Sequence, residues 1–205
     1  MSWTAATVLS IVAPAVYLVR LLPQPLRLHR TGVAAGVSPL AAMNALIGDV
    51  GWLGYGLSAD VASVWIVSGV ALVPAMWTVL LLRRRITPRD LLGAGVWAFV
   101  LVVSAAFGVI GLSLAAGVLV SQGPQVVEAV RDDDLSGIAP GTWYLALLDA
   151  ATWGAYGWAV ADAALVTYGV VLTVAAVVVL ARIAWTAHRG TTFRAAGRAW
   201  YDTSP

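Results

Sequence analysis

The sequence predicts an all-α membrane protein with seven transmembrane helices. Three observations lead to this fold class: a large excess of apolar residues, an internal repeat with an offset of 101 residues, and the positions of the arginines. We expect three helices, one linker helix and three more helices, with the N-terminus outside and the C-terminus inside.

The composition favours a bilayer as the solvent of this chain. Of its 205 residues, 60% are hydrophobic and 11% are charged, and the mean hydropathy is +0.87. A soluble domain of this size cannot bury so much apolar side chain, whereas a bilayer accepts it. The N-terminus lacks the basic start of a cleaved signal peptide, so we expect the first apolar segment to stay as a span.

Two stretches of the chain match each other at one offset without a gap. Pro23-Gln24 recurs as Pro124-Gln125, and Trp52-x-x-Tyr-Gly recurs as Trp153-x-x-Tyr-Gly, in both cases 101 residues later. Proline, tryptophan and glycine are not residues that an apolar composition repeats by accident. The match therefore indicates an internal duplication.

Seven apolar segments can be read along the chain. A helix that crosses a hydrocarbon core of about 30 Å needs about 20 residues. A helix start is predicted near residue 88: Thr87 fits the N-cap, Pro88 the first helical position and Asp90 the first turn. The uncharged run from 91 to 127 is too long for one span, so we expect a turn near 108–113. The predicted spans cover about 3–22, 39–57, 61–82, 91–107, 111–122, 141–160 and 163–183.

The arginines distinguish between topologies. All twelve basic residues are arginines, and with seven spans they all fall on one side, which the positive-inside rule identifies as the cytoplasm. Merging the fourth and fifth spans would divide them seven to five. Arg20, Arg27 and Arg30 are assigned to the first connection, so we expect no ion pair within the membrane.

The predicted organisation has four parts. They are a first three-helix repeat (1–86), a linker transmembrane helix (87–107), a second three-helix repeat (108–187) and a cytoplasmic tail (188–205). Because a single linker helix separates the two triplets, both have the same orientation across the membrane and the repeats are parallel. Parallel repeats of this kind are a common transporter design, with the substrate near the membrane midplane where the repeats meet.

These motifs resemble the PQ-loop superfamily. The repeat has Pro-Gln near the end of its first helix, then Gly-x-Ser/Ala-Pro, then Trp-x-x-Tyr-Gly, and the 3+1+3 layout is similar to the SWEET sugar facilitators, whose half-size relatives are the SemiSWEETs. The resemblance covers about residues 5–183. It implies a transporter of a small polar solute, sugar or amino-acid-like, that works by alternating access between two three-helix bundles. The alternatives are a proton-coupled transporter of amino acids or cationic solutes, as in lysosomal PQ-loop proteins, and a receptor or accessory protein on the same fold.

The resemblance implies roles for the repeated residues. Pro23-Gln24 and Pro124-Gln125 match the family's hinges, because proline removes a helix hydrogen bond and lets the helix bend. The alternative is that they only end a helix. Trp52 and Trp153 match the family's sugar-stacking tryptophans, and the alternative for them is a lipid-facing position.

The paired asparagines of the family are missing from this chain. The positions sixteen residues after the two tryptophans hold Ser68 and Gly169, and Asn44 is the only asparagine. The hydroxyls of Ser68, Thr167, Tyr168 and Thr173 are the candidate replacements. This departure puts a sugar substrate in doubt, although transport itself is still expected.

Two carboxylates, Asp49 and Asp149, fall inside predicted spans. A carboxylate near the bilayer centre costs roughly 2.5–3.5 kcal/mol, so such groups usually face a bundle interior or a wet cavity. The Asn44-x-x-x-Gly-Asp49 pattern is similar to the lysosomal branch. We expect these residues to bind a cationic or hydroxylated solute or to carry a proton. The alternative is that they hold helices together through backbone groups.

Nothing in the sequence indicates an enzyme. The chain has no cysteine, its two histidines lie in separate polar segments, and it contains no phosphate loop or nucleophile–histidine–acid arrangement. We expect no metal, no cofactor and no nucleic-acid partner. The expected partners are a small-molecule solute, the lipid bilayer and, in the second interpretation, protons; the oligomeric state stays open. The all-arginine composition suggests a bacterial source, which places the protein in a bacterial plasma membrane.

Overall fold

The computed structural model describes residues 4–32, 34, 37–131 and 140–202, without the side chains at 124, 125, 128, 140 and 187–202. Within these ranges the protein is all-helical, with 89% helix and no strand. The helices are α1 (Ala5–Leu21), α2 (Pro23–Thr31), α3 (Pro39–Ser58), α4 (Ala62–Leu82), the 3₁₀ helix η1 (Arg83–Arg85), α5 (Pro88–Ala106), α6 (Ile110–Ala116), α7 (Val118–Arg131), α8 (Pro140–Ala159) and α9 (Ala163–Asp202).

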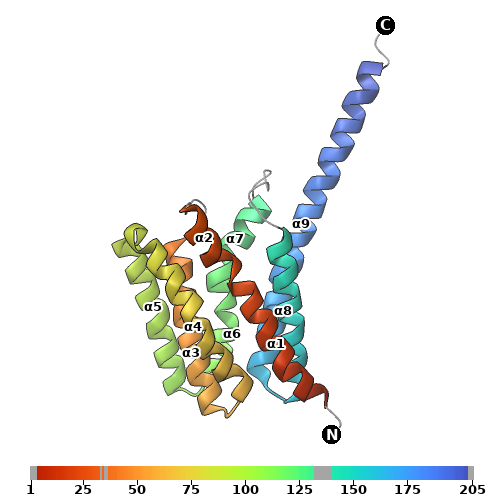
Figure 1. Ribbon diagram of the computed structural model, residues 1–205. Helices are drawn as coiled ribbons and strands as arrows, with labels where there is room; N and C mark the ends of the chain where they lie inside the picture. Colours follow the sequence, from red (N-terminus) through yellow and green to blue (C-terminus); the bar gives the residue numbers. More distant parts are fainter. Residues whose placement is uncertain (1–3, 33, 35–36, 132–139, 203–205) are drawn as a thin grey trace.

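The helices lie side by side in one bundle, and α9 projects far beyond it (Figure 1). The start of α1 and the turns α3–α4 and α8–α9 lie at one end of the bundle, and α2 and the α4–α5 connection lie at the other. The predicted tail from residue 188 continues α9 as far as Asp202. Alanine and arginine recur in this segment, and both are good helix formers.

Two of the helices begin at residues where the sequence contains helix-start signals. Thr87 accepts from the backbone N–H of Asp90 while the Asp90 carboxylate accepts from the N–H of Thr87, which completes a capping box with Pro88 inside it. This confirms the predicted helix start. Ser38 caps α3 in a similar way, because its side chain accepts a hydrogen bond from the backbone N–H of Ala41. Pro39 occupies the first helical position.

One predicted span ends where it was expected, and another is interrupted. The first ends at Leu21, and a new helix begins at Pro23, which accords with the missing N–H of proline. The fifth was predicted as one helix over 111–122, but it breaks at Gly117 between α6 and α7. A Cβ at Gly117 would lie 2.4 Å from a ring carbon of Trp97 on α5, so the break coincides with a close packing contact.

The turn expected within the long uncharged run is present. α5 ends at Ala106, α6 begins at Ile110, and Gly108 between them has a φ of 71°. This left-handed conformation is open to glycine at little cost. The predicted turn is therefore confirmed.

Two helical hairpins, α3–α4 and α8–α9, form the most extensive contacts of the bundle. α1 packs on α4 of its own half and on α8 of the other half. α6 packs on α9 of its own half and on α3 of the other. Exchanging the two halves therefore keeps the same pairs of neighbours, although α1 packs more extensively on the other half and α6 on its own.

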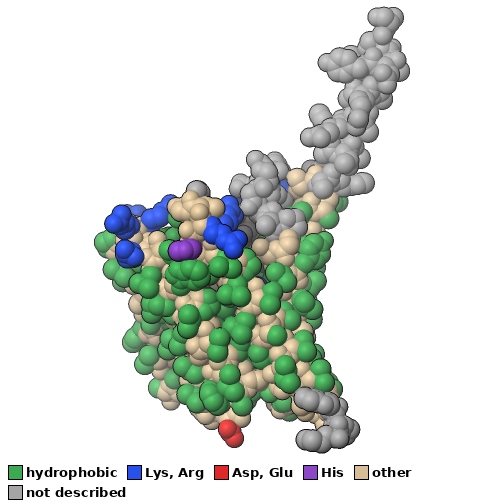
Figure 2. All heavy atoms as spheres, viewed as in Figure 1, with side chains coloured by type: hydrophobic (Ala, Val, Ile, Leu, Met, Phe, Trp, Pro, Cys, Tyr) green, Lys and Arg blue, Asp and Glu red, His purple; other side chains and the backbone are tan. Residues whose placement is uncertain are grey.

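The surface of the bundle is largely apolar. Four described stretches are long and apolar enough to cross a membrane, at 5–31, 62–85, 88–106 and 163–186. Large hydrophobic side chains lie exposed along the sides, including Val73, Phe99 and Phe107, and basic side chains gather at the end where α2 and the α4–α5 connection lie (Figure 2). These features are compatible with a multi-pass membrane protein.

Candidate functional site

A small cavity lies inside the bundle, and both hairpins line it. Its volume is about 40 Å³, which at roughly 10–15 Å³ per water molecule holds about three waters. Four side chains proposed from the sequence meet here: Trp52, Ser68, Trp153 and Tyr168. The full lining is Tyr17 from α1, Trp52 from α3, Val64, Val67 and Ser68 from α4, Trp153 from α8, and Leu165 and Tyr168 from α9.

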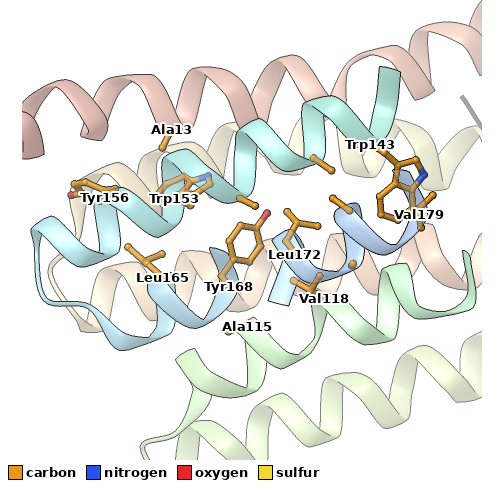
Figure 3. Close-up of a cluster of buried hydrophobic side chains, with 14 of the residues drawn as sticks. Ala13, Ala115, Val118, Trp143, Trp153, Tyr156, Leu165, Tyr168, Leu172 and Val179 are labelled. Carbon is orange, nitrogen blue, oxygen red and sulfur yellow. The ribbon is translucent and has the colours of Figure 1, made fainter. Parts of the chain in front are cut away.

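The two repeated tryptophans line this cavity from opposite halves of the chain. Trp52 stands edge-on to Tyr168, with ring centroids 5.8 Å apart and an interplanar angle of 87°. Trp153 contacts Tyr156 in a similar way at 6.0 Å. Figure 3 shows Trp153 on α8 and Tyr168 on α9 in one cluster of buried side chains, with the Tyr168 hydroxyl directed toward α8. Edge-to-face contacts of this kind hold the rings in defined orientations.

Asp49 on α3 lies behind the cavity wall and is buried. The hydroxyl of Tyr17 on α1 donates to its Oδ1 over 2.5 Å. Its Oδ2 is also buried and has no hydrogen-bond partner among the described residues. Asp49 therefore reaches the cavity through Tyr17, which is itself a lining residue.

Asp149 on α8 is fully buried, and two groups hold its carboxylate. The hydroxyl of Tyr168 donates to Oδ2 over 2.6 Å, and Nε of Arg20 lies 3.3 Å from the same oxygen. Nη2 of Arg20 also donates to the Tyr168 hydroxyl over 3.4 Å. The guanidinium carbon lies 5.4 Å from the centroid of the Tyr17 ring, in a cation–π position.

The ion pair between Arg20 and Asp149 shows that the expectation of no charge pair within the apolar bundle was wrong. Arg20 belongs to α1, which continues to Leu21 and packs on α8. Its side chain is only 16% exposed. A buried carboxylate without a partner costs several kcal/mol, and α1 supplies the compensating cation from inside the bundle.

The five side chains Asp49, Tyr17, Arg20, Tyr168 and Asp149 form one connected network. It holds two carboxylates and one guanidinium. Arg20 contacts Asp149 directly, whereas Asp49 has only the neutral hydroxyl of Tyr17 among the described contacts. With both carboxylates ionised and both tyrosines neutral, the network therefore carries one excess negative charge, and Asp49 is the carboxylate without a cation in direct contact.

The other predicted site residues lie apart from the cavity lining. Asn44 is buried on α3, and its Oδ1 has no partner among the described residues. Pro23 and Gln24 are exposed at the start of α2. Pro124 and Gln125 lie within α7, and their side chains are outside the described part. The described residues also contain no group of three or more His, Cys, Asp or Glu side chains that could hold a metal ion.

Gly169 explains why the position that the resemblance assigns to an asparagine holds no side chain. A Cβ at Gly169 would lie 2.6 Å from Cα of Gly154 and 2.7 Å from the carbonyl oxygen of Ala150. The backbones of α8 and α9 therefore touch at this point. Any larger residue would force the second hairpin apart beside Tyr168.

Replacing Gly169 with alanine is expected to destabilise the protein by about 1–3 kcal/mol, because the added methyl group overlaps fixed backbone atoms. Gly154→Ala on the facing helix is the matched control, since its Cβ would meet Gly169 at an ordinary 3.5 Å. Thermal unfolding in detergent should give a lower midpoint for the first variant than for the second. Equal midpoints would contradict the close approach.

A second, larger hollow of about 760 Å³ opens between the turns α3–α4, α5–α6 and α8–α9. Here the hydroxyl of Tyr55 on α3 donates to Oδ2 of Asp162 over 2.8 Å. Oδ1 of Asp162 accepts from the backbone N–H groups of Ala164 and Leu165, which caps α9. Tyr55 thereby ties the first hairpin to a fixed carboxylate of the second.

The two hairpins share backbone details at the 101-residue offset. Asp60 and Ala161 adopt left-handed φ angles of 54° and 56°. Gly56 and Gly157 each approach the next helix closely, since a Cβ would lie 2.6 and 2.7 Å from a backbone nitrogen there. The repeated Tyr-Gly motif therefore forms the same kind of turn in both halves.

Sequence reasoning missed Tyr17, Arg20, Tyr55 and Asp162 as site residues. Tyr17 and Arg20 are three residues apart and so share one face of α1, and Arg20 lies before the end of an apolar segment, where a charge needs a partner. Asp162 directly precedes a helix and fits an N-cap signal. Neither signal predicts which distant residues these side chains contact.

No protein-family model and no curated protein matches this chain. The proposed function therefore depends on the geometry of the cavity and its network.

Proposed function

We propose that the chain is a PQ-loop-type transporter that moves a small polar solute across a bacterial plasma membrane by alternating access. The observation that carries this proposal is the cavity that both hairpins line, with Trp52 and Trp153 contributed from positions 101 residues apart. Two buried carboxylates adjoin it through Tyr17 and Tyr168. Polar groups within a membrane bundle usually mark a solute or ion pathway.

The proposed topology has seven spans: α1, α3, α4, α5, α6 with α7, α8 and α9. It is supported by the grouping of basic side chains at one end of the bundle (Figure 2), as the positive-inside rule requires of a cytoplasmic end. α3 and α8 are 20 residues long, like the apolar helices beside them. They carry the buried aspartates, so they belong in the interior of the bundle rather than against lipid.

The arrangement of the halves supports alternating access between two three-helix units. The pattern of neighbours survives exchange of the halves, as two units related by a two-fold axis along the membrane normal require. The Tyr55–Asp162 hydrogen bond joins the units at the end that carries the N-terminus. The break between α1 and α2 at Leu22 supplies a bending point next to Pro23 and Gln24.

Uptake into proteoliposomes tests the proposal. Purified protein should accumulate at least one solute from a panel of sugars, amino acids and organic cations, and Trp52→Ala and Trp153→Ala should each lower that uptake at least about tenfold, because each removes a cavity wall. Trp158→Ala is the matched control, since Trp158 lies on α8 but is 81% exposed. Equal loss in all three variants, or no uptake of any solute, would contradict the proposal.

Proton coupling is a second candidate function, and the excess carboxylate of the network favours it. A proton on Asp49 would neutralise the charge that Arg20 leaves uncompensated. In the same liposomes an imposed pH gradient should drive uptake by the native protein, and Asp49→Asn should remove this dependence. Full activity of Asp49→Asn with an unchanged pH dependence would dismiss the proton role.

A further inference from the structure

The cavity supports a narrower statement, which rests on the proposed function. We infer that its solute is a small alkylammonium cation, held against the rings of Trp52, Trp153 and Tyr168 and balanced by the carboxylate of Asp49. The inference rests on four features of the described residues: the aromatic walls, the scarcity of hydrogen-bonding groups, the charge balance and the acidic entrance.

The walls of the cavity are mainly aromatic. Four of its eight lining residues are tyrosine or tryptophan, contributed by α1, α3, α8 and α9. The face of an aromatic ring attracts a cation, and aromatic cages are the usual site for quaternary ammonium groups.

Hydrogen-bonding groups are scarce in the lining. The hydroxyls of Tyr17 and Tyr168 already donate to Asp49 and Asp149, and the remaining residues are aliphatic apart from Ser68 and the tryptophans. A sugar would bury several hydroxyls here without partners, which is unfavourable. The methyl groups of an alkylammonium ion need no hydrogen bonds, so such an ion leaves fewer polar groups without partners in this lining.

The charge balance favours a monovalent cation. Arg20 offsets Asp149 at 3.3 Å, which leaves Asp49 as the uncompensated carboxylate. Tyr17, whose hydroxyl bonds Asp49, lines the cavity, so a cation there lies close to that charge. Charges in a water-poor interior interact more strongly than in bulk water, and a bound cation would bring the site to neutrality.

The larger hollow, at the end of the bundle that carries the N-terminus, has the same charge preference and is the proposed entrance. Asp60 and Asp162 are among its lining residues, and no basic side chain is. A cleft lined by charges of one sign concentrates ions of the opposite sign and raises their association rate. Arg20 lies beside the cavity but is paired with Asp149. The basic side chains that Figure 2 shows gather at the opposite end of the bundle, so they do not oppose cation entry from this side.

A binding measurement on the purified full chain tests this inference. The probe is choline, and its control is 3,3-dimethyl-1-butanol, which has the same shape with a neutral carbon in place of the nitrogen. Quenching of tryptophan fluorescence should show choline binding at least about tenfold more tightly than the neutral analogue. Equal affinities, tighter binding of glucose, or no binding of choline would overturn the inference.

Two variants locate the site. Asp49→Asn and Trp52→Ala should each weaken choline binding about tenfold, whereas Trp158→Ala should leave it unchanged. Asp60→Asn is a second control, because it should slow cation association at the entrance while leaving affinity for the inner cavity unchanged. Loss of choline binding in Trp158→Ala to the same extent as in Trp52→Ala would contradict the assignment. The comparison of choline with its neutral analogue uses the native chain and does not depend on how the variants fold.

The same experiments separate this inference from the proposed function. Choline that binds but never crosses the liposome membrane would uphold the cation site and reject transport of this solute. Glucose that is transported while choline fails to bind would uphold transport and reject the cation site.

Discussion

Replacing Arg20 with methionine is expected to destabilise the protein by about 3–5 kcal/mol, because it leaves the fully buried Asp149 carboxylate without its cation. Methionine retains much of the aliphatic stem that packs between α1 and α8, so the loss reports mainly on charge. Thermal unfolding in detergent should show the midpoint falling by roughly 10 °C.

A double variant distinguishes charge from packing. Arg20→Met combined with Asp149→Leu removes both charges and should recover much of the stability, since replacing a buried ion pair by apolar side chains is often neutral or favourable. Arg27→Met serves as the control for loss of an arginine, because Arg27 is exposed on α2. If the double variant were less stable than Arg20→Met alone, the ion pair would not be the source of the effect.

In the proposed topology, replacing Tyr55 with phenylalanine is expected to open the outer end of the bundle, which carries the N-terminus. The variant removes one hydrogen bond to a carboxylate, worth about 1.5–3 kcal/mol, which corresponds to a shift of roughly tenfold or more toward the open state. The N-cap bonds of Asp162 to Ala164 and Leu165 remain, so α9 should stay intact. The chain has no cysteine, so Ser68→Cys provides a single thiol in the cavity lining.

The measurement is the rate at which a membrane-impermeant thiol reagent modifies Ser68→Cys from the outer side. Adding Tyr55→Phe should raise that rate about tenfold, in line with the population shift. Tyr156→Phe is the matched control, since Tyr156 occupies the corresponding place in the second hairpin and makes no hydroxyl hydrogen bond within the described residues. An unchanged modification rate in the Tyr55→Phe variant would show that the Tyr55–Asp162 hydrogen bond does not restrict access to the cavity.

The helix boundaries could largely be predicted from the sequence because they depend on local signals. Pro39 and Pro88 fit first helical turns after Ser38 and Thr87, and α3, α4 and α8 begin and end close to their predicted positions. The last helix, α9, begins where it was predicted but continues beyond its predicted end near residue 183 to Asp202. The break at Gly117 was not predicted. It reflects a contact with Trp97, twenty residues earlier, and such tertiary contacts leave no periodic pattern in the sequence.

The candidate site could be predicted only in part. The repeat pointed to Trp52 and Trp153, and the structure places both at one cavity. Arg20 was assigned to a loop from its position, whereas its contact with Tyr168 spans 148 residues. Long-range partners of this kind follow from how helices are rotated about their axes, and an apolar helix that faces both lipid and protein gives little indication of its rotation.

Arg20 has no basic counterpart 101 residues further on, where the chain has Ser121. In an assembly of two identical subunits every ionisable group is present twice, so the total charge at the symmetry axis is an even number. A single polypeptide that contains both halves is free of that restriction. It can set one guanidinium against two carboxylates and hold an odd charge at its centre, which one monovalent ion can neutralise.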